Sequence, residues 1–124
     1  MSTLLRRYIS VPACLGLAAV LCSTAHAAGA DAAPPSQAQG WALAQDKSCL
    51  RCHAVDRHFV GPSFQQIADR YRGDPGAADR LATKIRQGSV GQWGRVIMPR
   101  QPQVSAADAA VLAAWVTQQG QPAR

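Results

Sequence analysis

Residues 49–53 read Cys49-Leu50-Arg51-Cys52-His53, the Cys-x-x-Cys-His spacing by which a c-type haem is attached. On a helix, positions i, i+3 and i+4 share one face, so the two thiols and the imidazole would point the same way. The thiols can then bond to the haem while His53 turns toward the iron. The motif therefore predicts one covalently bound haem.

Three other interpretations of the motif compete with haem attachment. A zinc site needs four ligands, and the available ones are crowded with no second paired motif; they are Cys49, Cys52, His53 and His58. A thiol–disulfide oxidoreductase would place its Cys-x-x-Cys near a strand–helix–strand pattern, which the sequence lacks. A purely structural disulfide leaves His53 without a role. Haem attachment accounts for all three side chains of the motif.

Met98 is the only methionine besides Met1, and it lies in a helix-poor stretch, residues 88–104. A loop of that length in a small domain is usually functional. Pro99 follows Met98 and would stiffen a loop that presents the sulfur. We therefore expect Met98 to be the sixth ligand of the iron, with His58 or an open position as alternatives. His/Met ligation favours electron transfer over oxygen or peroxide chemistry.

The remainder of the chain favours helices. No run alternates apolar and polar residues as a strand would, so we predict an all-α fold. Capping residues and glycines place about four short helices, over residues 36–52, 63–73, 74–88 and 106–118. The third would begin with Asp74 as its cap and Pro75 in its first turn. Gly40, inside the first helix, indicates a close contact with another segment.

The N-terminus has the features of a secretory signal peptide. Arg6 and Arg7 precede an apolar run at residues 11–21, and the small-residue signal Ala25-His26-Ala27 follows. The apolar run is shorter than the ~20 residues of a spanning helix, so we expect no stable membrane insertion. The chain is accordingly divided into a cleaved signal peptide (1–27), a flexible arm (28–39) and a folded domain (40–124).

Three blocks of the sequence, in the same order, resemble the short bacterial class I cytochromes c of the c-551 type. The blocks are Lys47-Ser48-Cys49-Leu50-Arg51-Cys52-His53-Ala54-Val55-Asp56, Val60-Gly61-Pro62-Ser63, and Lys84-Ile85-Arg86-Gln87-Gly88 continuing through Trp93-Gly94 to Met98-Pro99. The resemblance covers about residues 40–119. It implies a small class I cytochrome c fold, in which about four short helices wrap around one covalent haem c.

The resemblance also implies a role for individual residues. Four of them would hold the haem, Cys49 and Cys52 through covalent bonds and His53 and Met98 as axial ligands of the iron. The Pro62 carbonyl would accept the ring N–H of His53, and Trp93 would donate its indole N–H to a haem propionate. Lys84 would face a propionate. A turn proline, a core indole and a solvated cation are the alternatives for these last three residues.

After the methionine the family often has Pro-Pro-Asn, whereas here Pro99 is followed by Arg100 and Gln101. The side-chain amide expected near the methionine sulfur is therefore missing or displaced. The usual contact between the first and last helices would be made by Gly40, Trp41 or Ala44.

The motif and the resemblance together predict a monomeric, periplasmic electron carrier that converts no substrate. Its expected partners are redox proteins such as a nitrite reductase, a terminal oxidase or a respiratory complex. The alternatives are a haem subunit of a larger periplasmic dehydrogenase and a haem peroxidase-like enzyme. The formal charge of +6 would also suit nucleic acid, but an exported haem domain argues against that partner. Arginines near the haem-bearing segments are candidates for a docking rim: Arg51, Arg57, Arg95 and Arg100.

Overall fold

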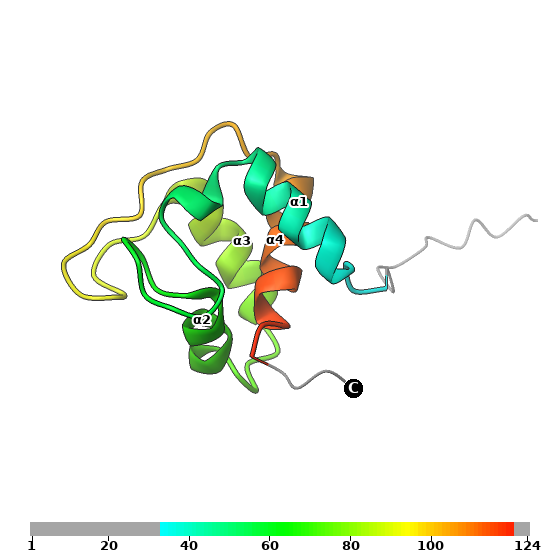
Figure 1. Cartoon of the computed structure of the whole chain (residues 1–124), viewed down its shortest axis with the longest axis horizontal. Coiled ribbons are helices and arrows are strands. Elements are labelled where there is room, and N and C mark those ends of the chain that lie inside the picture. Colours follow the sequence, from blue (N-terminus) through cyan, green and yellow to red (C-terminus); the bar gives the residue numbers. More distant parts are fainter. Residues whose placement is uncertain (1–32, 121–124) are drawn as a thin grey trace, which may run out of the picture. The chain divides into compact units, whose positions relative to one another are not determined.

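The computed structural model describes residues 33–120 of the chain (Figure 1). This part contains four α-helices and one short 3₁₀ turn, joined by loops. They are α1 (Gln37–Asp46), the 3₁₀ turn η1 (Cys49–Arg51), α2 (Phe64–Arg70), α3 (Ala77–Gln87) and α4 (Ala106–Thr117). Residues 33–120 contain no strand, and their one isolated β-bridge joins Ser89 to Met98. The prediction of an all-α fold is confirmed.

Serine hydroxyls start three of the four helices. Ser36 accepts a hydrogen bond from the backbone N–H of Gln39 at 3.2 Å, and Ser63 accepts one from Gln66 at 3.0 Å. In both cases the side-chain oxygen of the glutamine accepts a hydrogen bond from the backbone N–H of the serine, which completes a capping box. Ser105 caps α4 through the N–H of Asp108. These short-range bonds satisfy amides that a helix leaves unpaired at its start.

The first helix is shorter than predicted. It was expected to run through residue 52, but α1 ends at Asp46, and the cysteine motif begins in the separate turn η1 and continues two residues beyond it. Ser48 has φ 60°, a left-handed conformation that an α-helix cannot contain. Lys47 bridges this break to α4, with Nζ 3.0 Å from Asp46 and 3.4 Å from Asp108.

The third helix begins later than predicted. Asp74 was expected to cap it, but α3 starts at Ala77 with Gly76 as its cap. The carboxylate of Asp74 instead accepts the N–H of Gly76 at 2.9 Å, which closes a turn before the helix. The predicted end is confirmed, because α3 stops at Gly88.

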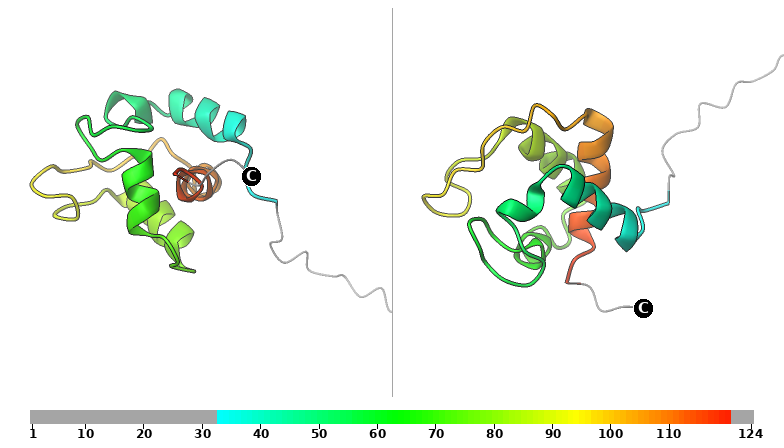
Figure 2. Two further views of the ribbon diagram at one scale, coloured as in Figure 1. Left: turned by 60° about the horizontal axis from the view of Figure 1, so that its bottom comes forward. Right: turned by 45° about the horizontal axis from the view of Figure 1, so that its top comes forward.

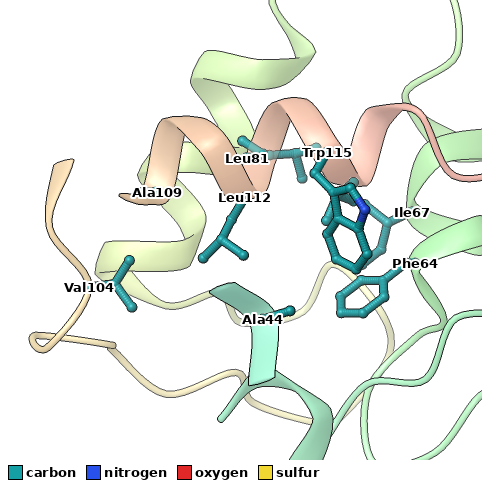
Figure 3. Close-up of a cluster of buried hydrophobic side chains, with 10 residues drawn as sticks. Ala44, Phe64, Ile67, Leu81, Val104, Ala109, Leu112 and Trp115 are labelled. Carbon is teal, nitrogen blue, oxygen red and sulfur yellow. The ribbon is translucent and has the colours of Figure 1, made fainter. Parts of the chain in front are cut away.

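The core is centred on α4, which packs against each of the other three helices. Figure 3 shows side chains from all four helices meeting around Leu112 and Trp115. Trp115 is 1% exposed, its ring meets Phe64 edge to face with centroids 4.8 Å apart, and its Nε1 donates to Gln37 at 2.9 Å. The buried cluster consists of Ala44, Phe64, Ile67, Leu81, Val104, Ala109, Leu112, Ala113, Trp115 and Val116.

The close contact expected at Gly40 is made with α4. A Cβ at this position would lie 2.0 Å from Cγ of Trp115, so only glycine lets the two helices approach this closely. Ala44 is fully buried in the same interface. Trp41, the other residue proposed for this contact, is 40% exposed and contributes less to it.

Part of the predicted domain division lies outside the described residues, namely the signal peptide (1–27) and the start of the arm. Within the arm predicted for residues 28–39, α1 already begins at Gln37. None of the helices described between residues 33 and 120 is long and apolar enough to cross a membrane.

Gly40→Ala should lower the free energy of unfolding by about 2 kcal/mol, because the added methyl group overlaps the Trp115 ring. The midpoint of urea unfolding measures the loss. Ala42→Ser, at an exposed position of the same helix, is the matched control and should cost only about 0.5 kcal/mol through helix propensity. A Gly40→Ala protein as stable as the control would show that the α1–α4 distance does not limit stability.

Candidate functional site

A mostly apolar cavity lies between the loops that flank η1 and the long loop between α3 and α4. In Figure 2 this second loop, drawn in yellow, extends to one side of the helices. Every helix except α1 contributes to the lining, which consists of Ser48, Cys49, Cys52, His53, His58, Val60, Gly61, Pro62, Phe64, Ile67, Tyr71, Leu81, Lys84, Ile85, Ser89, Gln92, Trp93, Val96, Ile97, Met98, Pro99, Gln101, Leu112 and Val116. All seven predicted site residues are in this set.

The two cysteines reach the cavity from a tight turn. Backbone N–H groups of Cys52 and His53 both donate to the carbonyl of Cys49, at 3.1 and 3.0 Å. This turn brings the three side chains to one wall of the cavity. The sequence predicted that they share one face of an α-helix, which is not the case. Both thiols are half-buried and free. Burial raises the pKa of the Cys49 thiol, which favours its neutral form.

His53 is oriented by a hydrogen bond to the Pro62 carbonyl. Its Nδ1 lies 2.7 Å from that oxygen, and because a carbonyl can only accept, Nδ1 carries the proton. Nε2 then keeps its lone pair for a metal. Burial lowers the pKa of His53, partly offset by the bond to Pro62, so the neutral ring is favoured.

Two neighbours restrict the imidazole further. The ring of Phe64 stacks on it with centroids 5.5 Å apart and an interplanar angle of 19°. A Cβ at Gly61 would lie 2.6 Å from Cε1 of His53, so glycine is needed for this approach. The ring is therefore held by a hydrogen bond, a stacked neighbour and a close backbone.

Met98 enters the cavity from the long loop. Its backbone exchanges two hydrogen bonds with Ser89, at 3.0 and 2.9 Å, which closes the loop at its base. The chain passes close to the end of α3 here, because a Cβ at Gly88 would lie 2.6 Å from the Met98 carbonyl oxygen. Gly88 also has φ 80°, which favours glycine.

Trp93 and Lys84 are half-buried and also line the cavity. The Arg70 guanidinium lies over the Trp93 ring, 4.7 Å from its centroid. Gln101 also lines the cavity, and its Nε2 donates to the Pro99 carbonyl at 3.1 Å. Gln101 thus supplies a side-chain amide to the cavity lining, but its N–H is bonded to the backbone of Pro99, so the expectation that the amide near the methionine sulfur is missing or displaced stays a prediction.

Sequence reasoning missed three contributors to the site. Phe64 lies in the second predicted helix and was given no role at the site, and Gly61 was quoted only as part of a resembling block. Arg70 was not considered at all. Their contacts join segments that are separated along the chain, and no periodicity or capping pattern encodes such pairs.

The charges of the described residues are unevenly paired. Most carboxylates of the helices have a basic partner within 4.0 Å: Asp46 and Asp108 with Lys47, Asp69 with Arg72, and Asp74 with Arg80. Arg51, Arg95 and Arg100 have no carboxylate within that distance among residues 33–120. All three lie in or beside the segments that line the cavity. These three arginines therefore place positive charge beside the cavity without an acidic partner among residues 33–120.

The donor groups suit a covalently attached haem better than a bare metal ion. Two thiols, an imidazole nitrogen and a thioether sulfur line one apolar cavity, and these are the groups that attach and ligate haem c. Over residues 33–120, no three His, Cys, Asp or Glu side chains are arranged to hold a metal ion. The four-ligand zinc alternative has no support there.

Comparison with known proteins agrees with this interpretation. A family model described as Cytochrome c matches residues 37–120, which include all four helices. Cytochrome c-551 of Allochromatium vinosum is 44% identical over 82 residues, which are 66% of this chain and 87% of that protein. Cytochrome c-551 of Azotobacter vinelandii is 48% identical over 77 residues, 62% of this chain and 93% of that protein.

A solved structure shares the fold. The crystal structure of wild-type Nitrosomonas europaea cytochrome c552 matches with a TM-score of 0.63 and 42% sequence identity. The match covers 64% of this chain and 98% of that one. The similarity therefore extends over nearly the whole of the smaller protein.

Proposed function

The chain belongs to the cytochrome c family, and from this membership we propose that it is a periplasmic electron carrier in which His53 and Met98 bind the iron of one haem c. Relatives in this family bind a single covalent haem c and transfer electrons, so the chain is a small haem electron carrier and not an enzyme. Beyond this family role, we propose which residues ligate the iron, which residues attach the haem, in which compartment the protein works and which partners it has.

The observation that carries the proposal is the meeting of two distant segments at one cavity. The Cys-x-x-Cys-His motif forms one wall, and Met98 comes from the loop before α4. Nε2 of His53 has a free lone pair because Nδ1 donates to Pro62. An imidazole and a thioether are the two axial ligands of electron-transfer haems with raised potential.

The residues of the site hold their positions while an electron is exchanged. When bound, the haem supplies the one-electron ferric–ferrous couple. His53 is kept in orientation by Pro62 and Phe64, and the Ser89–Met98 bridge holds the methionine backbone. Such fixed groups change little between the two oxidation states, which favours fast transfer.

Cys49 and Cys52 are proposed to form the covalent attachment, and Trp93 and Lys84 to interact with the haem propionates. The two thiols are free and half-buried on the motif wall. Trp93 and Lys84 lie at the same cavity and offer an N–H donor and a cation, which are the groups that a carboxylate binds.

The docking surface is proposed to surround the cavity mouth. Apolar side chains of two loops are exposed there, namely Phe59, Val60, Val96 and Ile97. Arg51, Arg95 and Arg100, which have no carboxylate partner between residues 33 and 120, lie on the same segments, with Arg57 beside Asp56. A small apolar patch with a charged rim suits brief encounters with redox partners. A nitrite reductase, a terminal oxidase or a respiratory complex would fit this role, reached after export by the signal peptide.

The first test is the absorption spectrum of the protein expressed in a periplasm that matures c-type haems. We expect a haem spectrum that changes on reduction, with haem retained after extraction with acidic organic solvent. The double variant Cys49→Ala/Cys52→Ala should release its haem under the same extraction, because no thioether bond remains. A colourless wild-type protein, or haem retained by the double variant, would contradict the proposed attachment.

Met98→Ala should remove the weak far-red absorption of the ferric protein, which arises from sulfur bound to iron. The midpoint potential should fall by on the order of 0.1 V, within the ~0.8 V range over which axial ligands set haem potentials. Val90→Ala, an exposed position of the same loop that does not line the cavity, is the control and should leave both unchanged. An unchanged far-red band in Met98→Ala would identify another residue, such as His58, as the ligand.

Electron exchange with ferricyanide, an anionic oxidant, should slow as salt is added. The Debye length falls from ~30 Å at 0.01 M to ~8 Å at 0.15 M ionic strength, so salt weakens the attraction between exposed arginines and the anion. The triple variant Arg51→Gln/Arg95→Gln/Arg100→Gln should be about tenfold slower at low salt and less salt-dependent. Arg80→Gln, whose native side chain pairs with Asp74, is the control. A triple variant with the wild-type salt dependence would show that the rim does not steer the encounter.

A further inference from the structure

The loop that carries Met98 has few contacts of its own. Of the eight residues 90–97, seven are exposed and only Trp93 is half-buried. Val90 is 70% exposed and Ile97 61% exposed, so apolar burial contributes little at these two positions. Trp93 is the residue of this stretch that packs against the buried cluster, and its ring needs a fixed orientation there. The reciprocal bonds between Ser89 and Met98 close the base of the loop but do not involve its tip, residues 91–94.

One side chain from another element holds the tip. Arg70, the last residue of α2, donates from Nη1 to the carbonyl of Gln92 at 2.6 Å. The same guanidinium lies over the Trp93 ring at 4.7 Å from its centroid. Between residues 33 and 120, the bond to Gln92 is the only hydrogen bond that joins residues 90–97 to a separate segment. Both polar contacts of the tip therefore depend on Arg70.

The N-terminal end of α2 lies beside the part of the site that contains His53. The helix starts at Phe64, directly after the cap Ser63 and the Pro62 carbonyl that accepts from His53. Its seven residues span roughly 10 Å at 1.5 Å per residue. A single rigid helix thus connects the group that orients the imidazole to the side chain that holds the methionine loop.

We propose that Arg70 is a positioning residue that fixes the Trp93 indole at the cavity wall and, through the loop tip, the presentation of Met98. The inference rests on the proposed function, since it takes Trp93 as a donor to the haem. Arginine suits this position because its planar guanidinium stacks on the indole while an N–H points to the Gln92 carbonyl. Lysine has a compact ammonium that cannot stack in this way.

The test compares Arg70→Gln with Arg72→Gln in the haem-loaded protein. Arg72 lies two residues further on and pairs with Asp69. Among residues 33–120 it has no hydrogen bond or cation–π contact with residues 90–97, so its variant removes the same charge and leaves the contacts of Arg70 in place. We expect hydrogen exchange of the Trp93 indole N–H, followed by NMR, to be about tenfold faster in Arg70→Gln. The midpoint potential should also fall more than in Arg72→Gln, because the lost charge is closer to the cavity.

Arg70→Lys separates geometry from charge. We expect its potential to stay near that of the wild type, while its indole exchange is as fast as in Arg70→Gln. Exchange at the wild-type rate in Arg70→Lys would overturn the proposal, because charge alone would then hold the indole. Equal exchange rates in Arg70→Gln and Arg72→Gln would overturn it as well.

The far-red absorption of each ferric protein distinguishes failure of this inference from failure of the proposed function. If the wild type shows the sulfur-to-iron band and exchange is the same in all variants, Met98 ligation stands and the role of Arg70 is wrong. If the wild type lacks the band, the proposed ligation is wrong, and with it the link from Arg70 to the methionine.

Discussion

One layer of apolar side chains serves as both the wall of the core and the wall of the cavity. Phe64, Ile67, Leu81, Leu112 and Val116 belong to the buried cluster and also line the site. In a chain this small the helices alone bury little surface, so a large apolar cofactor against this layer adds substantially to stability. The positions of α2, α3 and α4 are therefore tied to the site, and α1 acts on it indirectly by packing on α4.

The proximal side of the site is built by one short segment. Gly61 allows close approach to the imidazole, the Pro62 carbonyl accepts a hydrogen bond from its Nδ1–H, and Phe64 stacks on its face. Between them Ser63 caps α2, so the segment that orients His53 also starts the helix. The same helix ends in Arg70, which contacts the methionine loop. A single helix thus connects the segment that orients His53 to the loop that carries Met98.

The distribution of charge follows from the same architecture. Carboxylates on the helices pair with neighbouring bases, most of them a few residues away or on the adjacent element. The loops around the cavity have almost no acids, and of their arginines only Arg57 has a carboxylate within 4.0 Å among residues 33–120. Positive charge and exposed apolar side chains are therefore found together where the site opens to solvent. This combination suits a carrier that must bind and leave its partners quickly.

Local sequence accounts for the motif, the serine caps, the glycine stops and the helical class, because each depends on groups within about four residues of one another. The pattern also singled out Met98 in a long loop, and the family resemblance singled out Trp93 in the same loop. The pattern did not show that a 3₁₀ turn begins at Cys49 and ends just before Cys52, because the break at Ser48 is a backbone conformation that the side chain there does not indicate. Nor did it reveal the stacking of Phe64 on His53 or the contact of Arg70 with Trp93. Those pairs are set by the packing of α2 against α4 and the course of the long loop, which bring together residues that the chain keeps apart.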